Sequence, residues 1–209
     1  MNEESRQQAR QFLQPGEHLI AACSHELGPG VPTPPESMLA PPEPPDLQRR
    51  IEARLPRPLR QLAKSRGLDP RRSRPAAAAD AADRMPDAPD GLGSRATHGT
   101  SMEGGWESAA GHFVIGRANV RGSLTCVLAL TDRRWFGLSD VSPLWQTTPV
   151  MKQFWEVPRS AVAAVRANPT GALQMGRMDI EFTDGSWVAL LATAPAHARP
   201  FAAASARYR

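Results

Sequence analysis

The distribution of proline is the feature that most limits the fold of this chain. Fourteen of the 21 prolines lie between Pro29 and Pro89, in a sequence of 209 residues. Because proline lacks an amide hydrogen and fixes φ, a tract of this composition cannot form long helices or strand ladders. The remaining sequence, about half of the chain, is long enough for one hydrophobic core.

A β-hairpin is the clearest element in this foldable half. Residues 178–183 alternate apolar and polar side chains, Asp184-Gly185 follows, and a second apolar run begins at Trp187. Asp-Gly between two such runs is a strong short-range signal for a hairpin. A two-residue turn at this dipeptide would place Trp187 opposite Phe182 as a cross-strand pair. The sequence therefore predicts an antiparallel sheet, with the carboxylates of Asp179 and Glu181 on its solvent face.

Further short apolar runs bounded by turn residues predict a mainly β fold with helices at its two ends. A short helix is expected within residues 1–13, and a C-terminal helix over 195–208. Cys23 and Cys126 each fall inside an expected strand, where a free cysteine behaves as a small buried hydrophobe. The additional strands are expected at residues 17–23, 112–116, 124–130, 135–138, 152–157 and 161–166.

Several of these segments resemble a known family. They are the Leu-Thr-Asp-Arg-Arg turn at residues 130–134, the run Phe154–Val162, the hairpin at Ile180–Ser186, and the stretch Leu13–Ala22. Together they are similar to bacterial pleckstrin-homology-like domains, including the GRAM-type relatives. The resemblance implies a curved antiparallel β-barrel closed by a C-terminal helix. It also implies binding of proteins, peptides or lipid headgroups, although a fold does not fix a function.

The resemblance and the proline distribution together predict the domain organisation. Residues 1–13 form an N-terminal helix, and residues 14–24 and 110–209 form the pleckstrin-homology-like domain. Residues 25–109 are a Pro/Arg/Ala-rich disordered insertion with a short helical island at 46–66. Either this tract is an insertion in a loop, or Leu13–Cys23 is not the first strand of the domain. An insertion of this length is tolerated because the closure entropy of a loop grows only logarithmically with its length.

The helical island carries the strongest charge cluster of the sequence. Residues 46–74 contain ten basic and three acidic residues, a balance of +7. Such a segment could bind a protein partner, nucleic-acid phosphates or an anionic membrane, or its charges could simply be solvated on a helix that packs against its own domain. The candidate residues for binding an anionic partner are Arg49, Arg50, Arg54, Arg57, Arg60, Lys64 and Arg66.

No catalytic, cofactor-binding or metal-binding residues are assigned from the sequence. The five histidines show no paired ligand spacing, and no serine or cysteine nucleophile occurs in a recognisable motif. Trp106 and Trp145 lie outside the expected strands and are candidate interface residues. No secretory signal or membrane-spanning run is recognised. We therefore expect a non-enzymatic cytoplasmic interaction module, with peripheral membrane or nucleic-acid binding through residues 46–74 as the alternative.

Overall fold

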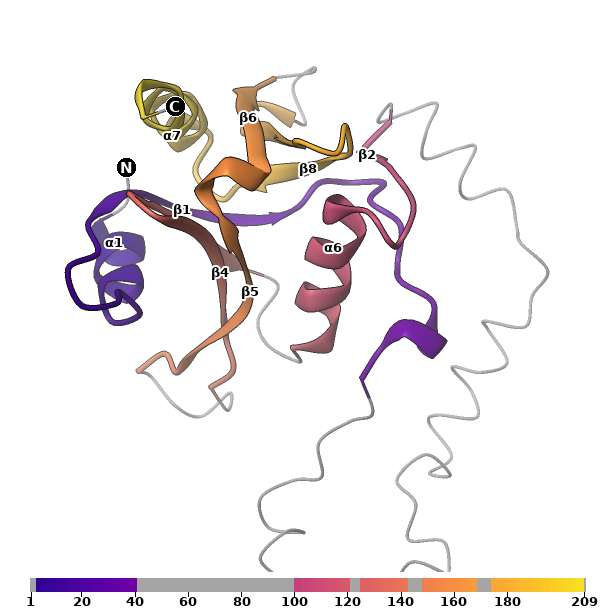
Figure 1. Cartoon of the computed structure of the whole chain (residues 1–209), viewed down its shortest axis with the longest axis horizontal. Coiled ribbons are helices and arrows are strands. Elements are labelled where there is room, and N and C mark those ends of the chain that lie inside the picture. Colours follow the sequence, from indigo (N-terminus) through magenta and orange to yellow (C-terminus); the bar gives the residue numbers. More distant parts are fainter. Residues whose placement is uncertain (1–2, 41–99, 121–124, 143–147, 169–173, 209) are drawn as a thin grey trace, which may run out of the picture. The chain divides into compact units, whose positions relative to one another are not determined.

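The computed structural model describes residues 3–40, 100–120, 125–142, 148–168 and 174–208 (Figure 1). The Arg-rich candidate site, the helical island and Trp145 lie outside these residues. The described part is an α+β fold built on one eight-stranded antiparallel sheet, packed against a C-terminal helix.

The sheet has the strand order β5-β4-β3-β1-β8-β7-β6, and the short strand β2 also pairs with β8. The N-terminal strand β1 therefore lies in the middle, between β3 and β8. The end strands β5 and β6 do not pair with each other in the described part of the chain. The strands are β1 (Leu19–Leu27), β2 (Met102–Glu103), β3 (Cys126–Thr131), β4 (Arg134–Asp140), β5 (Met151–Pro158), β6 (Val162–Ala167), β7 (Arg177–Phe182) and β8 (Trp187–Ala192).

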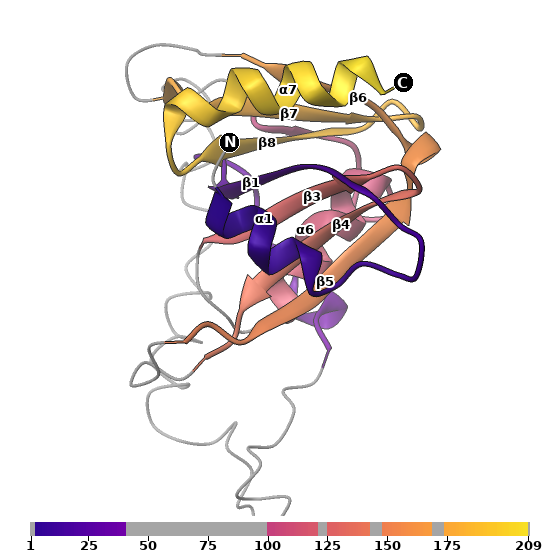
Figure 2. The ribbon, with the colours of Figure 1, turned by 90° about the vertical axis from the view of Figure 1, so that its left-hand side faces the viewer.

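Helices cover both faces of this sheet, and apolar residues fill the space beneath them. Figure 2 shows α1 in front of β3 and β4 and α6 behind these strands, with α7 at the top of the view beside β6 and β7. The larger core cluster lies under α6 and α7 and includes Phe113, Trp155 and Phe201. A smaller cluster under α1 includes Phe136. The helical elements are α1 (Glu3–Arg10), α6 (Ala109–Asn119) and α7 (Ala198–Arg207), with short 3-10 turns η1 (Glu36–Met38), η3 (Arg159–Ala161) and η5 (Pro195–His197).

The N-terminal and C-terminal helices and most of the expected strands are confirmed, but the strand expected at residues 112–116 is wrong. These residues lie in α6, which begins after Ser108, where the Ser108 hydroxyl accepts a hydrogen bond from Gly111 N–H. The buried side chains of Ala110, Phe113 and Val114 are spaced by three and four residues, as on one face of a helix. The apolar run His112–Gly116 concealed this spacing.

The predicted hairpin is confirmed, but its turn is longer by one residue. Phe182 N–H donates to Ser186 O at 2.8 Å, and Gly185 N–H donates back to Phe182 O at 3.1 Å. Gly185 has a φ of +83°, which glycine adopts without strain. The register therefore places Trp187 opposite Glu181 and not opposite Phe182.

The two segments that flank residues 41–99 meet beside β8. Gly28 N–H donates to Ala189 O, and Ala189 N–H donates to Ser101 O, both at 2.8 Å. The Ser101 hydroxyl donates to Pro29 O at 2.5 Å. β1 thus runs through Leu27, beyond its expected end, and both flanks of the long segment are fastened to β8 and to each other.

Candidate functional site

A cleft of about 920 Å³ lies between β6 and α7. We call it the β6–α7 cleft. It combines residues from four separate parts of the chain: the β3–β4 turn, the β5–β6 connection with β6 itself, the β7–β8 loop and the end of α7. Its lining residues are Leu130, Arg133, Trp135, Pro158, Arg159, Ser160, Val162, Ala163, Ala164, Val165, Arg166, Thr183, Ser205, Ala206 and Tyr208.

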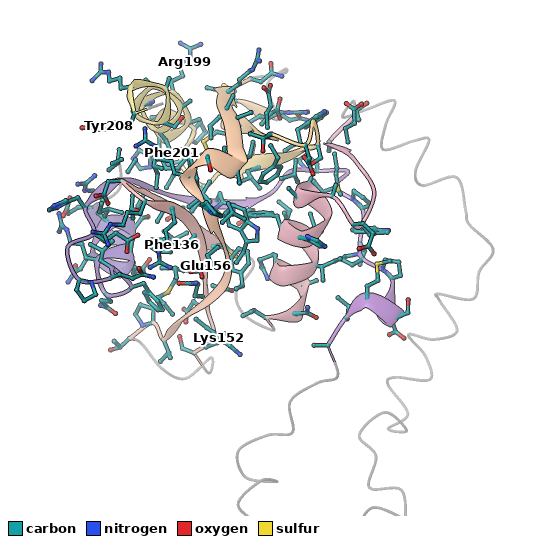
Figure 3. All side chains as sticks on the ribbon, viewed as in Figure 1. Phe136, Lys152, Glu156, Arg199, Phe201 and Tyr208 are labelled. Atoms are coloured by element: carbon teal, nitrogen blue, oxygen red, sulfur yellow. The ribbon has the colours of Figure 1, made fainter. Side chains whose placement is uncertain are left out.

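The floor of the cleft is apolar and rigid. Leu130, Trp135 and Val165 are all buried members of the main core. The Trp135 ring packs edge-on against Phe201 of α7, with centroids 6.1 Å apart. Figure 3 shows Phe201 between α7 and the sheet, with Arg199 on the opposite side of the helix. The floor is therefore part of the folded core and offers fixed apolar surface to a bound molecule.

The rim of the cleft is basic. Arg133, Arg159 and Arg166 line it, and among the described residues no Asp or Glu does. Arg166 forms an ion pair with Glu181 at 2.6 Å. Neither Arg133 nor Arg159 forms an ion pair with any residue that the structure describes. The Arg159 N–H donates to Arg133 O at 3.0 Å, so these two arginines are held next to each other.

A buried ion pair fixes the β3–β4 turn that carries Arg133. Glu17, whose side chain is fully buried, accepts hydrogen bonds from the Arg134 guanidinium at 2.9 Å and from the Thr131 hydroxyl at 2.7 Å. Burial alone would raise the pKa of Glu17, but these hydrogen bonds and one from Gln14 N–H outweigh it and lower the pKa. The hydrogen bond to Glu17 raises the pKa of Arg134, so both groups remain charged.

The outer edge of β6 is open to the cleft. Asn168 N–H donates to Arg177 O on β7, and peptide groups along a strand point alternately to its two sides. The N–H and C=O of Val165 and Ala167 therefore point away from β7. In the described part of the chain no other strand pairs with this edge. It can accept an extended segment as an added strand.

The carboxylates expected on the solvent face of β7 are both engaged by arginine. Asp179 is buried, contrary to the prediction, and accepts from Arg177 at 2.8 Å and from the Asn168 amide at 2.9 Å. Glu181 pairs with Arg166. Within the described ranges, no group of three or more His, Cys, Asp or Glu side chains is placed to hold a metal ion.

The other titratable groups of the core are buried away from the cleft. Burial raises the pKa of the Cys23 thiol to about 11 and also raises that of Cys126. Burial lowers the pKa of His25 to about 4. Its Nδ1 has no hydrogen-bond partner among the described residues. These groups are uncharged at neutral pH, which disfavours thiolate chemistry.

Trp106 is the one sequence-predicted binding residue that lies within the described part of the chain, and it does not line the cleft. Trp106 is half-buried and packs against the main core beside α6. The seven basic residues from Arg49 to Arg66 and Trp145 lie outside the described residues. Sequence reasoning missed Arg133 and Arg159, although both fall within the motifs that carry the family resemblance. The only signal was their position, one in a tight turn and one directly after Pro158.

Comparison with known proteins assigns no relative to this chain. No protein-family model matches the sequence, and no curated protein matches it significantly. In the part of the chain that the structure describes, no helix is long and apolar enough to cross a membrane.

Proposed function

We propose that this protein is a non-enzymatic cytoplasmic interaction module of the pleckstrin-homology-like type. Its sheet serves as a barrel-like scaffold and presents the β6–α7 cleft to an extended segment of a protein partner. The observation that carries this proposal is the open edge of β6 beside an apolar floor. The strand order, with β1 at the centre and a helix after β8, supports the expected topology.

The chemistry of the cleft suits an extended polypeptide. An added strand gains main-chain hydrogen bonds from the edge of β6, and alternate side chains enter the space between the strand and the helix. The floor residues Trp135 and Val165 offer apolar contact to these side chains. The cleft, at about 920 Å³, is large enough to bury several of them. The protein then acts as a scaffold: its hydrophobic core holds β6 and α7 in place, and the partner segment occupies the cleft between them.

The alternative predicted from the sequence, membrane or nucleic-acid binding through residues 46–74, concerns a segment outside the described residues. It stays a prediction.

Two substitutions on α7 test the proposal. Ala206 and Ala203 are both exposed residues of this helix, but only Ala206 lines the cleft. Ala206→Trp fills the cleft, and Ala203→Trp adds the same side chain outside it. We expect a displayed library of random peptides to yield binders to the full-length protein and to Ala203→Trp, and these binders to lose affinity for Ala206→Trp.

Thermal unfolding of both variants serves as the check that they remain folded. Binders that recognise Ala206→Trp as well as the unmodified protein would show that the cleft is not the binding site. A selection that yields no binder to the full-length protein would overturn the proposed function.

A further inference from the structure

We infer that the segment bound in the β6–α7 cleft is acidic, with carboxylate side chains alternating with apolar ones. This inference rests on the proposed function and names the chemistry of the partner. The fold alone does not set this preference, because the charges that line the cleft are a property of this sequence.

The cleft is positively charged. Its three charged lining residues, Arg133, Arg159 and Arg166, all carry the same sign. The charge of Arg166 is balanced by Glu181, whereas Arg133 and Arg159 have no ion pair among the described residues. Two uncompensated guanidinium groups therefore stand at the end of the cleft formed by the β3–β4 turn and η3. A carboxylate placed there gains a charge-assisted hydrogen bond.

This basic end is held in place by the fold. The Arg133 guanidinium donates to Gly16 O at 3.1 Å, and its backbone carbonyl accepts the N–H of Arg159. The nearby carboxylate of Glu17 does not neutralise these groups, because it is already paired with Arg134. Since the Arg133 guanidinium and the Arg159 backbone are positioned before a ligand arrives, the ordering cost of binding falls mainly on the side chain of Arg159.

The alternation follows from the strand geometry. On β6, the buried Val165 forms part of the apolar floor, while the next residue, Arg166, is exposed at the rim. A strand added beside β6 repeats this alternation, so every second side chain meets the floor and the others face the rim. Apolar residues fit the first set of positions and Asp or Glu the second.

Other occupants fit less well. The chain's own residues 46–74 carry a charge of +7 and would be repelled by the rim. A nucleic acid carries no peptide groups that could pair with the open edge of β6. A membrane surface would reach the rim but not the strand edge between β6 and α7.

The test uses fluorescently labelled peptides and the full-length protein at low salt. One peptide alternates Val and Glu, a second replaces each Glu by Gln, and a third carries Pro at positions that would pair with β6. We expect the Glu peptide to bind roughly tenfold or more tightly than the Gln peptide, the effect of one or two charge-assisted hydrogen bonds. The Pro peptide should not bind, because it cannot donate to the strand edge.

Matched arginine variants test whether the preference for the Glu peptide arises at the rim of the cleft. Arg159→Gln should weaken binding of the Glu peptide severalfold and reduce its salt dependence, while leaving the Gln peptide unchanged. Arg199→Gln, an exposed arginine of α7 outside the cleft, should change neither. Ala206→Trp should abolish binding of both peptides.

The outcomes separate the inference from the proposed function. Equal binding of the Glu and Gln peptides, with loss in Ala206→Trp, would overturn the acidic partner and leave the cleft as a peptide site. Binding of neither peptide would overturn both. A DNA duplex or a phosphatidylserine vesicle that binds through Arg159 and Ala206 where the Glu peptide does not would also overturn the inference, in favour of a phosphate ligand.

Discussion

Replacement of His25 should remove a specific part of the acid sensitivity of this protein. His25 lies on β1 opposite Cys126, fully buried, with its ring 6.2 Å from that of Phe113. Burial lowers its pKa from 6.5 to about 4, and the guanidinium of Arg117 on α6 acts in the same direction. A hydrogen bond to the backbone of Cys23 opposes the shift. The folded state therefore binds a proton at His25 less readily than the unfolded chain does.

The sign and size of the effect follow from this difference. His25 is neutral in both the folded and the unfolded state above pH 6.5, so it has no effect on stability there. Because its pKa in the folded state lies below that in the unfolded state, it lowers the free energy of unfolding as the pH falls from 6.5 to 4. A shift from 6.5 to about 4 corresponds to about 3 kcal/mol when complete, and to about 2 kcal/mol at about pH 5. A His25→Leu variant should therefore lose about 2 kcal/mol less stability than the unmodified protein between about pH 7 and pH 5.

Urea unfolding at these two pH values, followed by tryptophan fluorescence, measures the difference directly. Carboxylates such as Glu17 also titrate as the pH falls, but they do so in both proteins and cancel in the comparison. The control is His18→Leu, which removes an exposed histidine of the same segment and leaves the buried imidazole of His25 in place. If His25→Leu and the unmodified protein lose equal stability, the neutral buried imidazole is not responsible for this part of the acid sensitivity.

Three further predictions concern the core. Glu17→Gln should lower the free energy of unfolding by about 3 kcal/mol at neutral pH, because it leaves the Arg134 charge without its buried partner; urea unfolding measures it. Gly137→Ala should cost about 1–3 kcal/mol in the same assay, since its Cβ would lie 2.4 Å from Cζ of Phe154. The Cys23 thiol, with a pKa of about 11, should react with a thiol reagent only as fast as the protein opens, so that urea accelerates labelling.

The two substitutions each have a matched control. Gln153→Ala should cost much less than Glu17→Gln, because Gln153 is a neutral side chain that accepts from the same guanidinium at 3.3 Å and donates to Glu156 at 2.8 Å. Gly105→Ala introduces a methyl group with no atom within 4 Å and should be neutral. Equal losses within either pair would contradict the packing argument for that site. Rapid labelling of Cys23 in the absence of urea would contradict its burial.

The sheet was predictable where the signals are local. The hairpin of β7 and β8 follows from alternation over residues 178–191 and from Asp184-Gly185, and the turn between β3 and β4 was equally clear. The alternation did not reveal the extra turn residue, because Gly185 in a left-handed conformation fits both a two-residue and a three-residue loop.

The helix α6 was missed because packing outweighs local preference there. Gly111 and Gly116 argue against a helix in isolation. In the fold, a Cβ at Gly111 would lie 2.4 Å from Trp106 O, and one at Gly116 would lie 2.8 Å from Phe154 O. The two glycines thus permit the close approach of the helix to its neighbours.

The cleft could not be predicted because its members are brought together only by tertiary structure. Arg133 and Arg159 are 26 positions apart in the sequence, and Ala206 is contributed by the last helix. A charge count identified the basic run at residues 46–74 but gave no weight to two isolated arginines. What distinguishes them is that neither forms an ion pair with a residue that the structure describes, a property of the fold.

The central position of β1 has a consequence for the biosynthesis of this protein. β1 is made first, but Leu27 pairs with Leu190 of β8, roughly 160 residues later. At about 5–20 residues per second, the ribosome needs on the order of ten to thirty seconds to supply that partner. The largely apolar strand Leu19–Leu27 has both hydrogen-bonding edges open until β3 is made, roughly 100 residues after β1, and the edge that pairs with β8 stays open for the whole interval. A ribosome-stalled chain that ends before β8 is therefore expected to recruit holding chaperones until translation resumes.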